Sequence, residues 1–166
     1  TNAFGTATIT IQLQDNGGTA VGAIDTKTNT FTVQVDSIND QPTLNPIANL
    51  AVSVDASLQT INLAGISVGG GSFESGQVIS ISAVSSDVGV VPNPTVNYTS
   101  ANATGTLTFT PVASTTGTVT VTVTVTDDGG VANSGVDTLI RTFQVVVAPN
   151  SAPRINTIST VTTNPT

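Results

Sequence analysis

Aspartate and asparagine are the residues of this chain whose types and spacing best suit a chemical role. Two aspartates open the run Asp127-Asp128-Gly129-Gly130, and Asn39-Asp40 stands just before Pro42. Side chains of these types offer oxygen ligands, which suit a hard cation such as calcium, with about six to eight oxygens in irregular geometry. The candidate ligands of one such site are Asp36, Asn39, Asp40, Asp87, Asp127 and Asp128.

The composition argues against most other site chemistries. The chain has no cysteine and no histidine, so thiolate metal sites and Ser-His or Cys-His nucleophile systems cannot be built. There is no tryptophan, and aromatic residues are 4% of the chain, so a sugar platform beside paired carboxylates is not expected. The sequence therefore predicts a protein that is not an enzyme.

The charge balance is acidic. The chain has three lysine and arginine residues in total and ten aspartate and glutamate residues, which gives a net charge of −7. Charged residues are only 8% of the chain. Nucleic acids and anionic lipids attract clustered basic side chains, so neither partner is expected. No stretch approaches the roughly 20 apolar residues of a membrane span, so direct membrane insertion is not expected either.

The elements that must position the acids are β-strands. From Thr118 to Thr126 valine alternates with threonine, which is the period-two pattern of a strand with one buried face and one wet face. Further strand candidates, among them Gly89–Val91, are separated by turn signals such as Gly69-Gly70-Gly71. Seven strands in about 110 residues are typical of an all-β, antiparallel Greek-key sandwich.

The chain also repeats itself. Gly5-Thr-Ala-Thr-Ile returns as Gly117-Thr-Val-Thr-Val, and Phe31-Thr-Val-Gln-Val returns as Phe143-Gln-Val-Val-Val, in both cases 112 positions later. A fixed period of this length indicates a tandem array. We expect residues 1–41 to be the C-terminal third of a preceding repeat, residues 42–153 a complete repeat, and residues 154–166 the first strand of a following repeat, so that the chain is an internal part of a longer polypeptide.

Several motifs together carry a family resemblance. They are the run Thr60–Ile66, the run Gly105–Pro111, the turn Thr126-Asp-Asp-Gly-Gly130 and the linker Asn39-Asp-Gln-Pro42. These motifs resemble the immunoglobulin-like or cadherin-like repeats of giant bacterial surface adhesins. The resemblance covers the whole chain and implies an Ig-like sandwich in a tandem array.

In such a sandwich we expect the turn at 127–138 and the loop at 85–87 to lie at the end that receives the linker, so that all six candidate ligands converge there. The resemblance implies calcium at this junction, because cadherin-like repeats bind calcium between domains. The alternative is structural: in a tight hairpin, aspartate caps backbone amides and glycine supplies positive φ. The sequence leaves both interpretations open.

The resulting hypothesis is a structural stalk segment of a large, secreted bacterial surface adhesin or filament. Its partners would be adjacent repeats of the same polypeptide or neighbouring subunits, and its location would be extracellular, at the bacterial cell surface. Two alternatives are a subunit of a fibre assembled by strand complementation and a module that binds carbohydrate or protein. A smooth polar surface would favour the stalk, and an exposed aromatic or carboxylate patch would favour the binding module.

Overall fold

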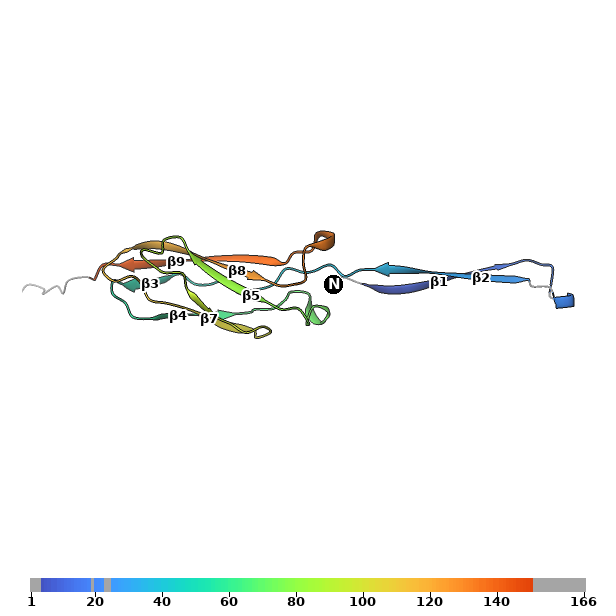
Figure 1. Cartoon of the computed structure of the whole chain (residues 1–166), viewed down its shortest axis with the longest axis horizontal. Helices are drawn as coiled ribbons and strands as arrows, with labels where there is room; N and C mark the ends of the chain where they lie inside the picture. Colours follow the sequence, from blue (N-terminus) through green and yellow to red (C-terminus); the bar gives the residue numbers. More distant parts are fainter. Residues whose placement is uncertain (1–3, 19, 23–24, 151–166) are drawn as a thin grey trace, which may run out of the picture.

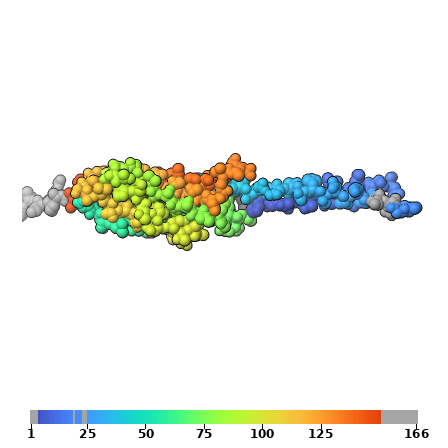
Figure 2. All heavy atoms as spheres, viewed as in Figure 1, coloured from blue at the N-terminus to red at the C-terminus, as the bar shows by residue number. Residues whose placement is uncertain are grey.

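The computed structural model describes residues 4–18, 20–22 and 25–150, and they form a long two-stranded hairpin followed by a two-sheet sandwich (Figure 1). The two parts lie end to end along one axis, and the hairpin is much narrower than the sandwich (Figure 2). The expected first strand of a following repeat, at 154–166, lies outside the described residues.

The hairpin pairs β1 (Gly5–Gln14) with β2 (Thr26–Val35), antiparallel over their full lengths. Because directly opposed residues share a face, Ile9 opposite Phe31 and Ala7 opposite Val33 fall on the same side. The other side carries threonine and glutamine. A short 3-10 turn, η1 (Ala20–Gly22), lies at the far end of the hairpin.

The sandwich consists of a four-stranded sheet and a three-stranded sheet. The first has the order β3-β9-β8-β5, and the second has the order β4-β7-β6. The strands of the first sheet are β3 (Leu50–Ser53), β5 (Ser80–Ser85), β8 (Gly117–Thr126) and β9 (Thr138–Ala148). Those of the second are β4 (Gln59–Ala64), β6 (Thr95–Asn97) and β7 (Thr104–Phe109). Two further 3-10 turns are η2 (Gly71–Phe73) and η3 (Ala132–Ser134).

The core lies between the two sheets and follows the predicted alternation. The four odd-numbered valines from Val119 to Val125 are at most 1% exposed, whereas the threonines between them are partly exposed. Phe143 and Val145 on β9 extend this buried stripe, and Leu63 and Leu107 meet it from the second sheet. The predicted all-β class is confirmed.

Two expectations about the strands are wrong. The sheets are not wholly antiparallel, because β3 pairs with β9 in parallel, with Leu50 opposite Val145. The segment Gly89–Val91 is a turn rather than a strand, and the amides of Val90 and Val91 both donate to the Asp87 carbonyl. Val91 is apolar because it is fully buried in the core, which periodicity alone cannot distinguish from strand membership.

The buried stripe yields a first prediction. Val123→Asp places a carboxylate at a position with no solvent exposure, so we expect a loss of about 3–5 kcal/mol of unfolding free energy, enough to unfold the sandwich at 37 °C or below. Thr118→Asp, on the exposed face of the same strand, is the matched control and should melt like the parent. Circular dichroism melting measures both. Equal melting of Val123→Asp and the parent would contradict the assignment of the buried face.

Candidate functional site

The feature that joins hairpin to sandwich is the side chain of Asn39, which is only 9% exposed. Its Nδ2 donates to Asp127 Oδ1 at 2.9 Å and to the Val136 carbonyl at 3.0 Å, and its Oδ1 accepts from Gln77 Nε2 at 2.8 Å. The Asn39 carbonyl also accepts from the Val136 amide at 3.1 Å. One amide side chain therefore ties the incoming linker to the β8–β9 turn and to the segment before β5.

A second buried group, Glu74, holds the next residue of the linker. Glu74 is 6% exposed, and its two carboxylate oxygens accept from the backbone amides of Asp40 and Gly70, each at 2.8 Å. A buried carboxylate is costly unless it is hydrogen-bonded, and these two amides satisfy it. We call Asn39, Glu74, Gln77 and Asp127 the linker clamp.

Glycine makes room for the clamp where side chains would collide with it. A Cβ at Gly129 would run into the side chains of Asn39 and Gln77, and a Cβ at Gly70 would run into the Glu74 carboxylate. The glycine-rich loop and the Asp-Asp-Gly-Gly turn are thus needed for close approach to the linker.

The linker beyond the clamp belongs to the sandwich. Gln41 Nε2 donates to the Thr138 carbonyl at 2.8 Å, Pro42 is fully buried, and Arg141 Nε donates to the Leu44 carbonyl at 3.0 Å. The residues from Asn39 to Leu44 are therefore fixed against β9, and the joint lies just before Asn39.

An aromatic pair bridges the joint. Phe4, at the base of the hairpin, meets Phe73 of η2 edge to face, with ring centroids 4.8 Å apart and planes at 87°. Ser37 and Ile38 line a small hollow beside this pair, together with Glu74. Aromatic pairs in this geometry add about 0.5–1.5 kcal/mol beyond their buried area.

Of the six expected cation ligands, the structure brings Asn39 and Asp127 into direct contact and places Asp128 beside them. Asp128 Oδ1 accepts from the Val78 amide at 2.8 Å, and Asp127 Oδ1 also accepts from the Gly129 amide at 3.0 Å. Both aspartates thus act as backbone caps, as the structural alternative predicted.

The other three expected ligands do not join this group. Asp36 is exposed and accepts from Gln34 Nε2 at 2.7 Å, and the exposed Asp40 contributes its backbone amide to Glu74. Asp87 lies at the opposite end of the sandwich, so its expected convergence is wrong: it follows β5, which runs antiparallel to β8, the strand that Asp127 follows. Within residues 4–18, 20–22 and 25–150, no group of three or more Asp or Glu side chains could hold a metal ion.

Sequence reasoning did not identify Glu74, Gln77, Phe4 or Phe73 as residues that hold the joint. A lone acid in a glycine-rich loop is normally solvated, so no local pattern predicts the burial of Glu74. Its burial arises from the approach of the Asp40 and Gly70 amides, which are far apart in the sequence. The one local signal is the phenylalanine at position 73, which is unusual in so polar a loop.

The clamp yields a second prediction. Asn39→Ala removes the side-chain donor to the Val136 carbonyl and one of the two donors to Asp127 Oδ1, so we expect a loss of about 1–3 kcal/mol of stability. Asn102→Ala, at an exposed site, is the control. Asn39→Asp sets a new carboxylate against the Asp127 carboxylate, and this repulsion raises the folded-state pKa of the introduced carboxyl above its unfolded-state value of about 4. Its deficit should be largest at neutral pH and should shrink as the pH falls from the raised folded-state pKa towards about 4. A pH-independent deficit would contradict the contact with Asp127.

Calcium at the joint remains a prediction. Two buried oxygens there, Asp127 Oδ2 and Gln77 Oε1, have no hydrogen-bond partner in the protein, but they are fewer than a calcium ion requires. A cation that binds only the folded joint would raise the melting temperature with calcium and lower it with chelator. Asp40→Ala combined with Asp127→Ala should abolish that response. Identical melting curves of the parent in calcium and in chelator would leave the aspartates as turn formers.

No protein-family profile matches this chain, and no curated protein sequence matches it. Solved structures of low identity resemble this chain in part. The titin domains Z1Z2 in complex with telethonin have 18% identity and a TM-score of 0.44, with 68% of this chain and 50% of that one covered. Domains 4 and 5 of the S-layer protein SbsC have 19% identity and a TM-score of 0.39, with 87% and 59% covered. The chain thus spans about half the length of these structures, and likeness at this level carries no conclusion about function.

Proposed function

We propose that this chain is a structural spacer of an extracellular bacterial surface protein, in which sandwiches are stacked end to end and joined by clamped linkers. The observation that carries the proposal is the joint itself. The hairpin continues the long axis of the sandwich (Figure 1). The linker between them is fixed by side chains from two separate segments, the loop before β5 and the β8–β9 turn. A protein that only needed to tether two domains would not require a buried amide side chain in its linker and a buried carboxylate that accepts from the linker backbone.

The surface supports the same role. The outer faces of β8 and of the hairpin carry rows of threonine, which is polar but uncharged. Of the three exposed phenylalanines, Phe4 and Phe73 contact each other at the joint, and Phe31 lies on the hairpin. In the described part of the chain no helix is long and apolar enough to cross a membrane. The proposed role is mechanical and involves no catalysis.

A binding module is the competing proposal, and joint rigidity distinguishes the two. The absence of cysteine allows clean spin labelling at Thr32→Cys on β2 and Thr118→Cys on β8, both exposed positions. For a spacer we expect one narrow distance distribution by pulsed electron paramagnetic resonance. Asn39→Ala should broaden it, whereas the control Asn102→Ala should leave it unchanged. A broad distribution in the parent would contradict the spacer function.

A further inference from the structure

The β1–β2 hairpin has the same strand pairing as the β8–β9 hairpin, position by position. Each of the ten residue pairs of β1 and β2 has a counterpart in β8 and β9, 112 positions later. Gly5 opposite Val35, for example, is matched by Gly117 opposite Val147. The two ladders therefore have the same length and the same register. A one-residue slip would have reversed the faces of every side chain.

The turns at the ends of the two ladders are also alike. The Asp15 amide donates to the Asp25 carbonyl at 2.9 Å, and the Asp127 amide donates to the Asp137 carbonyl at 3.0 Å. Asp15 Oδ1 accepts from the Gly17 amide at 2.8 Å, as Asp127 Oδ1 accepts from Gly129. η1 and η3 each have a left-handed residue at their centre, with φ of 59° and 55°.

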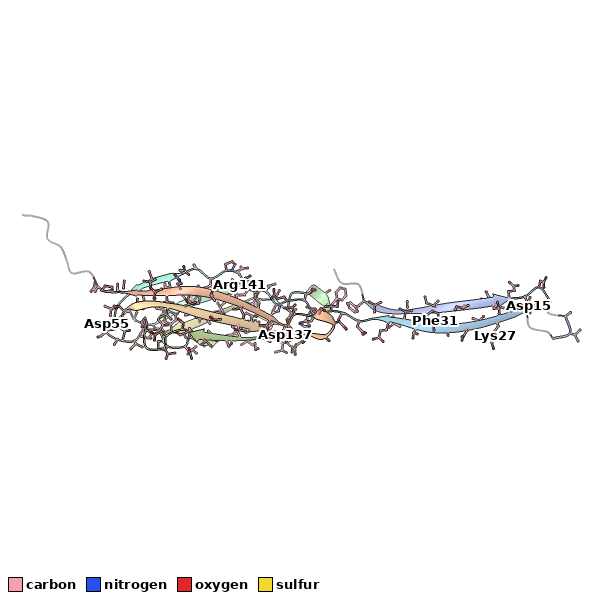
Figure 3. The ribbon with its side chains drawn as sticks, turned by 90° about the horizontal axis from the view of Figure 1, so that it is seen from above. Asp15, Lys27, Phe31, Asp55, Asp137 and Arg141 are labelled. Carbon is pink, nitrogen blue, oxygen red and sulfur yellow. The ribbon has the colours of Figure 1, made fainter. Side chains whose placement is uncertain are left out.

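The two hairpins differ in what covers their apolar faces. Phe143 and Val145 are at most 2% exposed, whereas their counterparts Phe31 and Val33 are 50% and 42% exposed. The whole apolar face of the first hairpin is open, and Figure 3 shows Phe31 on the free ribbon, away from the sandwich. We call this surface the hairpin face; its members are Ile9, Ile11, Leu13, Phe31, Val33 and Val35.

The second hairpin shows what covers a face of this design. The sheet β4-β7-β6 packs over it with Leu63, Leu107 and Phe109, each at most 4% exposed. At the sheet edges β5 pairs with β8, and β3 pairs with β9. Five strands that precede β8 in the sequence, β3 to β7, thus complete the β8–β9 hairpin.

We propose that the hairpin face docks a five-stranded half-sandwich with the layout of β3–β7, supplied by the same polypeptide ahead of the hairpin. The proposal rests on the proposed stacking of sandwiches and names the partner of its first unit. A second copy of this chain is a poorer occupant, because its own β4, β6 and β7 already pack against its β8 and β9.

The hairpin face also indicates how its cover differs from β3–β7. Ile9, Ile11 and Leu13 are each larger than the valine at the matching position of β8. Lys27 stands where β9 has the nearly buried Leu139, and it lies toward the tip of the hairpin (Figure 3). We expect the natural cover to offer more room along β1 and to leave a solvent path near Lys27.

The test extends the full chain by placing a copy of residues 36–115 directly before Phe4, which reproduces the spacing of the complete sandwich. Hydrogen exchange is followed in the segments 5–14 and 26–35, together with binding of an apolar dye. Covering the hairpin should slow exchange in both segments by at least about 100-fold and reduce dye binding. Phe31→Asp in the extended chain is the matched control and should restore fast exchange while leaving the sandwich at 39–148 intact.

A second variant allows for overpacking between the hairpin face and the added copy of β3–β7. It gives the hairpin face the residues that β8 and β9 have at the matching positions, through Ile9→Val, Ile11→Val, Leu13→Val and Lys27→Leu in the extended chain. Protection in either extended chain supports the proposal. Fast exchange in both would overturn it, and so would concentration-dependent protection of the unextended chain, because the cover would then come from a second copy. Neither result depends on the rigidity of the joint, which tests the spacer function separately.

Discussion

A strand that alternates valine with threonine can bury one face only, and the whole structure depends on where that face goes. In β8 the valines from Val119 to Val125 are fully buried because a second sheet lies over them. At roughly 1.5–3 kcal/mol for each large apolar side chain removed from water, this stripe is a major part of what stabilises the sandwich. The threonines on the other face keep the sheet soluble with few charges.

The joint solves a different problem with polar groups. A linker that merely ran past the β8–β9 turn would leave its backbone amides and carbonyls in water. Instead, Asn39 replaces water around Asp127 and the Val136 carbonyl, and Glu74 accepts from the Asp40 amide. Buried polar networks have low tolerance for partial loss, since each orphaned group then costs its full desolvation. That property suits a position that must hold one geometry.

The sequence was a good guide to what local periodicity controls and a poor guide to what depends on distant approach. Alternation identified the buried face of β8, and the 112-residue offset anticipated the match between the two hairpins. Asp127 was recognised as both a turn former and a ligand candidate, and its capping of Gly129 follows from the Asp-Asp-Gly-Gly pattern. The prediction of a strand at Gly89–Val91 is wrong because a short apolar run in a core-facing turn has the same pattern as a strand.

The prediction placed Asp87 at the wrong end of the sandwich, and the cause is geometric. Neighbouring antiparallel strands have their C-terminal ends at opposite ends of the sheet, so the residues that follow β5 and β8 cannot meet. That conclusion required the pairing of β5 with β8, which the strand pattern alone does not specify. The burial of Glu74 was beyond reach for a related reason, because its partners come from a loop and a linker more than 25 residues apart.

The parallel pairing of β3 with β9 has a mechanical consequence. The chain enters the sandwich near β3 and leaves it from β9, so tension applied through the two ends pulls these strands past each other along their own axes. Their ladder, extended by the 2.7 Å bond from the Val54 amide to the Ala148 carbonyl, is then stretched in shear. In that geometry the hydrogen bonds between β3 and β9 must break together rather than one after another. The four-residue strand β3 and the linker contacts ahead of it would thus share the force that a sandwich of this design withstands before it unfolds.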